Sequence, residues 1–114
     1  MGYYYAFDGD DVGAKIELIM FEGKVYDLPK YSQEVTNALN NLKNIMENMG
    51  CESLFCAGDS LLCYSEKLMN NSSIPLVSGR IKFSLGIGNN PGNSILALKK
   101  AKGTGKNRFE ILIT

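Results

Sequence analysis

The chain has 114 residues, of which 45% are hydrophobic and 21% are charged. These values are ordinary for a globular protein, and the length suffices for one hydrophobic core, so we expect a single domain over residues 1–114. Twelve basic and twelve acidic residues give a formal net charge of zero. A neutral chain has no overall attraction to nucleic acid or to an anionic membrane, and we expect neither as a direct partner.

Histidine is absent, which excludes a Ser-His-Asp triad, a histidine zinc site and acid–base catalysis by histidine. Cys51, Cys56 and Cys63 are odd in number and lack the spacing of a metal site, so we interpret them as reduced core thiols. No apolar stretch approaches the ~20 residues of a membrane span, and no signal peptide is visible. Together these features predict a cytoplasmic location.

The first half of the chain predicts a strand, two helices and a hairpin. Aromatic residues predict a strand over residues 3–7, and apolar residues at helical spacing predict a helix that ends near Gly23. Pro29 precedes a second predicted helix, capped at Ser32 and stopped by Gly50. Its apolar stripe, which we interpret as core, consists of Val35, Leu39, Leu42, Met46 and Met49.

Two apolar runs, residues 53–57 and 61–64, flank the pair Gly58-Asp59 and predict a hairpin whose turn has glycine in its first position. A polar stretch over residues 66–73 follows, which we expect to be a short helix or a loop. Residues 80–88 then alternate between apolar and small or polar side chains, the pattern of a half-buried strand.

Residues 89–92 predict a turn, because they combine two asparagines with a proline and a glycine. The apolar face of a last helix consists of Ile95, Leu98 and Ala101, and we expect this helix to end at Gly103 or Gly105. Residues 109–113 alternate in a closing strand.

This order of elements predicts an α+β fold of ferredoxin-like arrangement, with an antiparallel or mixed sheet and helices on one face. The other face of the sheet is expected to be open. Ala6, Ser84 and Gly86 would lie on that face and leave room for a ligand or a second subunit.

Two acidic turns carry the functional signal. The predicted first strand leads into Phe7-Asp8-Gly9-Asp10-Asp11-Val12-Gly13, and the hairpin turn reads Cys56-Ala57-Gly58-Asp59-Ser60. If the strands are neighbours, Asp8 and Asp59 meet at the rim of the sheet and repel each other unless a cation lies between them. Hard oxygen ligands suit Mg²⁺ or Mn²⁺, which usually accompany phosphates. The pair therefore indicates nucleotide chemistry.

Simpler interpretations exist for each of these features. Asp-Gly and Gly-Asp are ordinary turn pairs, and Asp10 or Asp11 would serve equally as a cap of the following helix. The basic residues near the carboxyl terminus would equally be a solvated helix face. This basic cluster consists of Lys99, Lys100, Lys102, Lys106 and Arg108.

Three segments in the same order resemble GGDEF diguanylate cyclases. Ser84-Leu85-Gly86-Ile87-Gly88 resembles their Ser-Ile-Gly-Val strand. Residues 97–108, Ala-Leu-Lys-Lys-Ala-Lys-Gly-Thr-Gly-Lys-Asn-Arg, resemble their Ala-Leu-x-x-Ala-Lys-x-x-Gly-Arg-Asn segment. Ala57-Gly58-Asp59-Ser60 stands in the place of the GGDEF hairpin itself.

Within that superfamily, the short length and the Phe-Asp-Gly-Asp-Asp-Val-Gly opening look most like the minimal CRISPR polymerases. These are stand-alone palm domains similar to the polymerase subunit of type III CRISPR complexes. The resemblance implies a nucleotidyltransferase that makes a cyclic nucleotide signal from nucleoside triphosphates in anti-phage defence. A downstream effector would read that signal. Because two or more nucleotides must be held together, a homodimer with facing sites is the simplest assembly.

The resemblance also implies roles for individual residues. Asp8 and Asp59 would bind two divalent metals, Mg²⁺ or Mn²⁺, with the Gly9 carbonyl as a further ligand. The nucleotide would be held by residues of both acidic turns and of the basic cluster. These residues are Asp10, Asp11, Val12, Gly13, Gly58, Ser60, Lys102 and Lys106.

Three departures from the GGDEF pattern matter. Ser60 replaces a residue that is usually acidic, so the hairpin offers a single carboxylate. The asparagine that reads guanine would fall near Ile16, which favours ATP as the substrate. Lys106 replaces an arginine and loses its bidentate geometry.

Three rival interpretations remain open at this point. The domain could be a catalytically silent nucleotide-binding sensor of the same fold, or a structural α+β module whose acidic turns are only turns. It could also be an archaeal-type GTP cyclohydrolase, although that family resembles two such domains in tandem.

Overall fold

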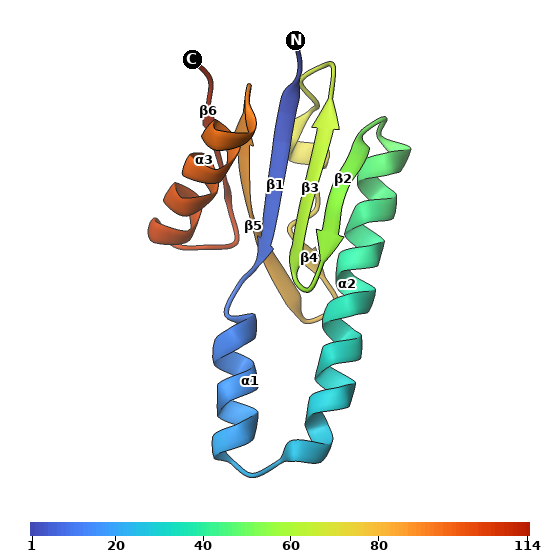
Figure 1. Cartoon of the computed structure of the whole chain (residues 1–114), viewed down its shortest axis with the longest axis vertical. Coiled ribbons are helices and arrows are strands. Elements are labelled where there is room, and N and C mark those ends of the chain that lie inside the picture. The colour runs from blue at the N-terminus through green and yellow to red at the C-terminus, as the bar shows by residue number, and fades with distance from the viewer.

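The computed structural model, which describes all residues 1–114, contains three α-helices and a six-stranded mixed sheet, on which α2 and α3 pack (Figure 1). The predicted α+β class with a mixed sheet is confirmed. In chain order the elements are β1 (Tyr3–Gly9), α1 (Val12–Phe21), the 3₁₀ helix η1 (Val25–Asp27), α2 (Leu28–Asn48), β2 (Glu52–Ala57), β3 (Ser60–Ser65), the 3₁₀ helix η2 (Asn71–Ser73), β4 (Val77–Ser78), β5 (Ile81–Gly88), α3 (Pro91–Gly103) and β6 (Phe109–Leu112).

The first strand lies in the middle of the sheet. The strand order is β2-β3-β1-β5-β4, and β6 also pairs with β5. Only the β5–β6 pair is parallel. The register places Asp8 opposite Ser60 of β3 on one side and opposite Ser84 of β5 on the other. The end of β1 is therefore enclosed by both neighbouring strands.

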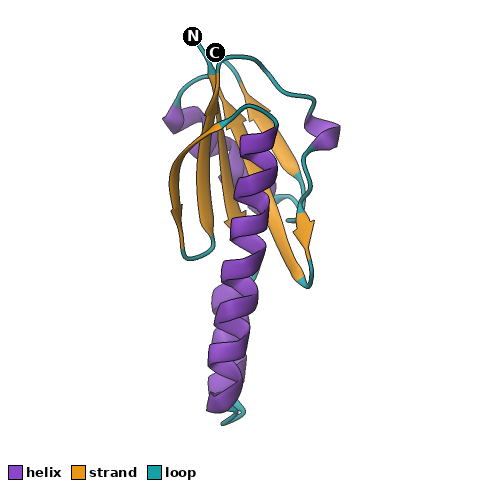
Figure 2. Ribbon diagram, turned by 90° about the vertical axis from the view of Figure 1, so that its right-hand side faces the viewer, coloured by secondary structure: helices purple, strands orange, loops and turns teal.

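The main core lies between one face of the sheet and α2, which runs in front of the strands in Figure 2. Tyr5 and Phe7 of β1 are almost fully buried there, together with Leu85 of β5. The predicted stripe of α2 packs against them, with Met49 only partly buried. Periodicity alone predicted this stripe correctly, because a helix that covers a sheet buries one side of itself.

The prediction that helices cover only one face is wrong for α3. Gly86 and Gly88 point away from the main core, and a Cβ atom on Gly86 would lie 2.0 Å from the Ser94 carbonyl oxygen of α3. Ala6, Ser84 and Gly86 therefore leave room for α3, not for a ligand or a second subunit. For the same reason β5 is buried on both faces, not half-buried as predicted.

Part of that second face does remain open, because α3 packs on β5, β6 and β1. The register places Tyr4, Leu62, Tyr64 and Phe55 together on this part. Tyr4 contacts Tyr64, with 5.1 Å between the ring centroids, and Phe55 is 55% exposed. We call these four side chains the open sheet patch.

Two helix starts differ from the prediction. The second helix begins at Leu28, not at a cap on Ser32, because proline is accommodated in a first helical turn, where no amide hydrogen is needed. The third helix begins at Pro91, inside the predicted turn, and Asn90 caps it by accepting a hydrogen bond from the Asn93 amide. Within the polar stretch after the hairpin, only residues 71–73 are helical.

The molecule is elongated, measuring 48 × 28 × 21 Å. The first helix and the amino-terminal half of α2 form a helical hairpin that extends beyond the end of the sheet (Figure 1). None of the helices combines the length and the apolar character that a membrane crossing requires.

We predict that Gly86→Ala destabilises the fold by about 2–3 kcal/mol, because the new methyl group would overlap backbone atoms of α3 that cannot move aside. Chemical denaturation would measure the change. Gly103→Ala is the matched control, since a Cβ atom there meets nothing within 4 Å. Equal stability of the two variants would contradict the close packing of α3.

Candidate active site

The two acidic turns meet at the rim of the sheet. The Gly9 amide donates a hydrogen bond of 2.9 Å to the Asp59 carbonyl oxygen, which ties the hairpin turn to the end of β1. The Ser60 hydroxyl donates to Asp8 Oδ1 at 2.9 Å. Gly58 has a positive φ of 60°, and Asp59 does not have a positive φ. Both observations agree with the predicted hairpin turn that has glycine in its first position.

Glycine at position 9 makes this approach possible. A Cβ atom there would lie 3.0 Å from the Asp59 Cβ and 3.1 Å from its Oδ2. The Asp59 side chain thus packs directly over the backbone at the end of β1. The Gly9 carbonyl oxygen lies in the same turn as the Asp8 carboxylate.

The carboxylates of Asp8 and Asp59 repel each other, and a bound cation would reduce this repulsion. Burial raises the pKa of Asp59, and the negative charge of Asp8 raises it further. Nowhere do three or more His, Cys, Asp or Glu side chains gather into a metal-binding cluster. A cation here would therefore rest on two carboxylates and a backbone oxygen. Mg²⁺ often binds through only one or two carboxylates, with substrate phosphates completing its shell, so this donor set fits.

Lys102 reaches into the same place from α3. The solvated-face interpretation is wrong for Lys102, because its side chain is only 24% exposed, while its expected contact with phosphate stays a prediction. Its ammonium group lies 2.8 Å from the Gly9 carbonyl oxygen and 3.3 Å from that of Asp8. It also lies 3.2 Å from Asp8 Oδ2 and 2.8 Å from Asp10 Oδ1.

Asp10 is directed into the protein, and its side chain is 5% exposed. Besides Lys102, it accepts hydrogen bonds from the Ser84 hydroxyl at 2.7 Å and from the Asn107 amide at 2.8 Å. Burial by itself would raise the pKa of Asp10, but these hydrogen bonds outweigh it and lower the pKa. Asp10 does not cap α1, so the capping interpretation is wrong for this residue.

Ser84 was expected only as a small residue on the open face of the sheet, and Asn107 was given no role. Both belong to segments that resemble GGDEF cyclases, and the residue type offers a further signal for Asn107. It has a φ of 47°, next to Lys106 at 63°, and asparagine tolerates this left-handed conformation better than most residues. That conformation turns the Asn107 amide toward Asp10.

Asp11 and Lys106 pair with each other at the start of α1. Asp11 occupies the position before the helix, but its side chain makes no capping hydrogen bond, so the capping interpretation is wrong. The hydrogen bond from Lys106 to Asp11 raises the pKa of Lys106. The first amides of α1, at Val12 and Gly13, are thus left without a side-chain cap. Amides in this position favour anions.

The rest of the basic cluster faces elsewhere. Lys100 and Arg108 both pair with Glu110 of β6, and Lys99 is exposed without an ion pair. The solvated-face interpretation therefore holds for these three residues, while Lys102 and Lys106 turn toward the acidic turn.

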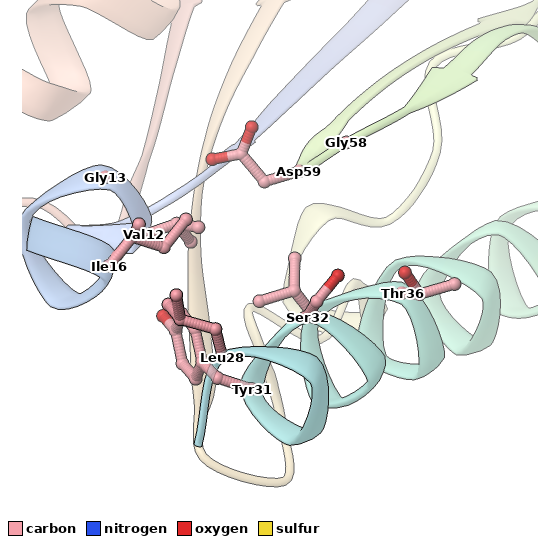
Figure 3. A pocket seen from close by; sticks show the side chains of 10 residues that line it. Val12, Gly13, Ile16, Leu28, Tyr31, Ser32, Thr36, Gly58 and Asp59 are labelled. Carbon is pink, nitrogen blue, oxygen red and sulfur yellow. The ribbon is translucent and has the colours of Figure 1, made fainter. Parts of the chain in front are cut away.

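A pocket of about 510 Å³ opens between α1 and α2, with the Asp59 carboxylate at its edge (Figure 3). Its apolar wall includes Val12, Ile16 and the ring of Tyr31. Hydroxyl groups come from Ser32 and Thr36 of α2, which the sequence analysis missed because serine and threonine on a helix rarely indicate a site. The lining is completed by Gly13, Leu28, Val35 and Gly58.

The fold and the acidic rim define a palm domain of the nucleotide cyclase and polymerase type. The structure is similar to that of the active GGEEF domain of a diguanylate cyclase from Vibrio cholerae, with a TM-score of 0.62 and 15% sequence identity. The similarity covers 96% of this chain and 81% of that chain, and at this identity it establishes the fold alone.

The family is established by sequence. The model of the minimal CRISPR polymerase domain, mCpol, matches residues 4–112, so the chain belongs to the mCpol family. The suspected resemblance is therefore confirmed. Comparison with curated protein sequences finds no match.

We predict that Asp10→Asn lowers the free energy of unfolding by about 2 kcal/mol at pH 7, because it weakens charge-assisted hydrogen bonds in a buried site. The pKa of Asp10 is lowered in the folded state, so this contribution is full above its ordinary value of 3.8 and declines as the pH falls below it. Denaturation of both proteins between pH 7 and pH 3 would measure the difference.

Asp11→Asn is the control, because the Asp11 side chain is 62% exposed and its surface ion pair contributes little to stability. A difference between wild type and Asp10→Asn that stays constant down to pH 3 would contradict the assignment.

Proposed function

We propose that this mCpol domain is a metal-dependent nucleotidyltransferase that joins nucleoside triphosphates, ATP above others, into a cyclic nucleotide or oligonucleotide. One observation carries the proposal: a backbone hydrogen bond joins the turns of Asp8 and Asp59, whose charges influence each other, and Asp59 lines a pocket of nucleotide size. Family membership supports a polymerase-type reaction. We further propose that the product is a signal in anti-phage defence, read by a separate effector.

The rim residues would handle the phosphates. Asp8, Gly9 and Asp59 would hold magnesium or manganese, which when bound supplies electrostatic stabilisation of phosphate charge. The uncapped amides at Val12 and Gly13 point from the helix start toward the same rim, and Lys102 and Lys106 add positive charge beside it. No histidine base is required for such a reaction, because positioning and charge neutralisation supply most of the acceleration.

The pocket between α1 and α2 would take the base. Its apolar wall suits an aromatic ring. The hydroxyl groups of Ser32 and Thr36 could donate hydrogen bonds to the edge of a base or accept them from it. Ile16 lines the pocket where the resembled GGDEF pattern has a guanine-reading asparagine. An apolar residue there leaves the edge of guanine without that partner, which supports adenine.

Ser60 favours a second candidate function, a sensor that binds a nucleotide without turnover. Because residue 60 is a serine, the hairpin contributes one carboxylate where GGDEF enzymes usually have two acidic residues. The Ser60 hydroxyl instead donates a hydrogen bond to Asp8. A site with reduced negative charge would suit a sensor that binds a nucleotide without turnover.

We predict a homodimer in solution when triphosphate and metal are present. One domain carries one acidic pair, whereas cyclisation needs two nucleotides side by side, and the open sheet patch is apolar surface beyond the area that α3 covers. Light scattering at micromolar concentration would measure the mass. A monomer under these conditions would count against a dimeric enzyme.

We predict that the protein, given Mg²⁺ or Mn²⁺ and the four ribonucleoside triphosphates, releases pyrophosphate and builds a product that resists phosphatase. Asp8→Asn and Asp59→Asn should each abolish this product while the fold persists, because each removes one charge from the rim and no packing from the core. Chromatography of phosphatase-treated reactions would measure the product, and separate incubations with ATP and GTP would compare the bases.

Glu17→Gln is the matched control, since it removes an exposed carboxylate that makes no ion pair. Full activity of either aspartate variant would refute the metal site. Triphosphate binding by the wild type without any resistant product would favour the sensor.

A further inference from the structure

The ammonium group of Lys102 lies among oxygen atoms that a divalent cation would also use. It contacts the Gly9 carbonyl oxygen at 2.8 Å and Asp8 Oδ2 at 3.2 Å. Both groups belong to the donor set proposed above for the metal. In the free protein, Lys102 thus supplies the positive charge that neutralises this part of the rim.

Lys102 is held in this position from two sides. The third helix is fixed by the close contacts of its backbone with Gly86 and Gly88. At the other end of the side chain, Asp10 accepts from the ammonium at 2.8 Å and is itself held by Ser84 and Asn107. The contact with Asp8 and Gly9 is therefore built into the fold.

A divalent cation and an ammonium group that contact the same oxygen atoms lie close enough to repel each other strongly. A divalent ion bound to Asp8 Oδ2 and the Gly9 carbonyl would repel an ammonium group at the present position of Lys102, and a partly buried site screens that repulsion weakly. The ammonium group of Lys102 can keep its contact with the Asp10 carboxylate when its contacts with Gly9 and Asp8 are broken.

We propose that Lys102 is a built-in competitor of the metal at Asp8 and Gly9. In the free protein its ammonium occupies part of the cation site, and metal entry displaces it toward Asp10, from where it can reach a bound triphosphate. Metal binding would then place Lys102 in the position that phosphate binding needs, so each event favours the other. This inference rests on the metal site of the proposed function.

Binding of Mn²⁺ alone, without nucleotide, tests the competition. Electron paramagnetic resonance of free Mn²⁺ during a titration would give the affinity of each protein. We expect Lys102→Met to bind Mn²⁺ about tenfold more tightly than wild type, because a positive charge in contact with two ligands is removed. Lys99→Met is the matched control on the same helix, exposed and without an ion pair, and should change the affinity less than twofold.

A second variant addresses folding, because Lys102→Met leaves Asp10 buried without its cation. The double variant Asp10→Asn with Lys102→Met removes both partners and keeps an acceptor for Ser84 and Asn107. It should show the same gain in Mn²⁺ affinity. Equal affinities of the Lys102 variants and Lys99→Met would overturn the competition.

Nuclear magnetic resonance of ¹⁵N-labelled lysine gives an independent readout. The Lys102 ammonium, in contact with four oxygen atoms, should give a signal protected from solvent exchange. We expect saturating Mg²⁺ to shift or remove this signal. An unchanged signal would overturn the displacement.

Asp59→Asn separates this inference from the proposed function. If wild type binds Mn²⁺ in a manner that Asp59→Asn abolishes, while Lys102→Met has no effect, the metal site stands and the competition fails. If no protein, including the Lys102 variants, shows binding that depends on Asp59, the metal site fails and the competition with it.

Discussion

The ion pair between the buried Asp10 carboxylate and the partly buried Lys102 ammonium group is the interaction on which the candidate site depends. It joins the end of β1 to the last turn of α3, and hydrogen bonds from Ser84 and Asn107 add β5 and the loop before β6. Three partners far from Asp10 in the sequence thus converge on its carboxylate. Because a buried charge without partners is costly, each of these segments is confined to a narrow range of positions.

The close packing of α3 makes this pair possible. Glycines at 86 and 88 let the backbone of the helix approach the sheet, and Ala97 and Ala101 are the small side chains buried at that contact. A larger residue in β5 would lift the helix and carry the Lys102 ammonium away from the rim. Gly86 and Gly88 are thus a requirement of the site, although neither belongs to it.

The candidate site is divided between two structural environments. The acidic rim is built on strand ends and backbone hydrogen bonds, where the Gly9 amide and the Asp59 carbonyl hold the two turns together. The pocket lies in the helical hairpin that extends beyond the sheet, and its walls are side chains of α1 and α2. The fold thus separates the part proposed to hold phosphates and metal from the part proposed to hold a base.

The sequence by itself determined every strand except the short β4, together with the core stripe of α2, the hairpin turn at Gly58 and the presence of two acidic turns. These features follow from local periodicity and from the backbone freedom of glycine, which act within a few residues. Only the tertiary structure decided which face α3 covers and where Lys102 and Asp10 point. Their contact spans 92 positions in the chain, and a charged side chain is buried only where distant segments supply its partners.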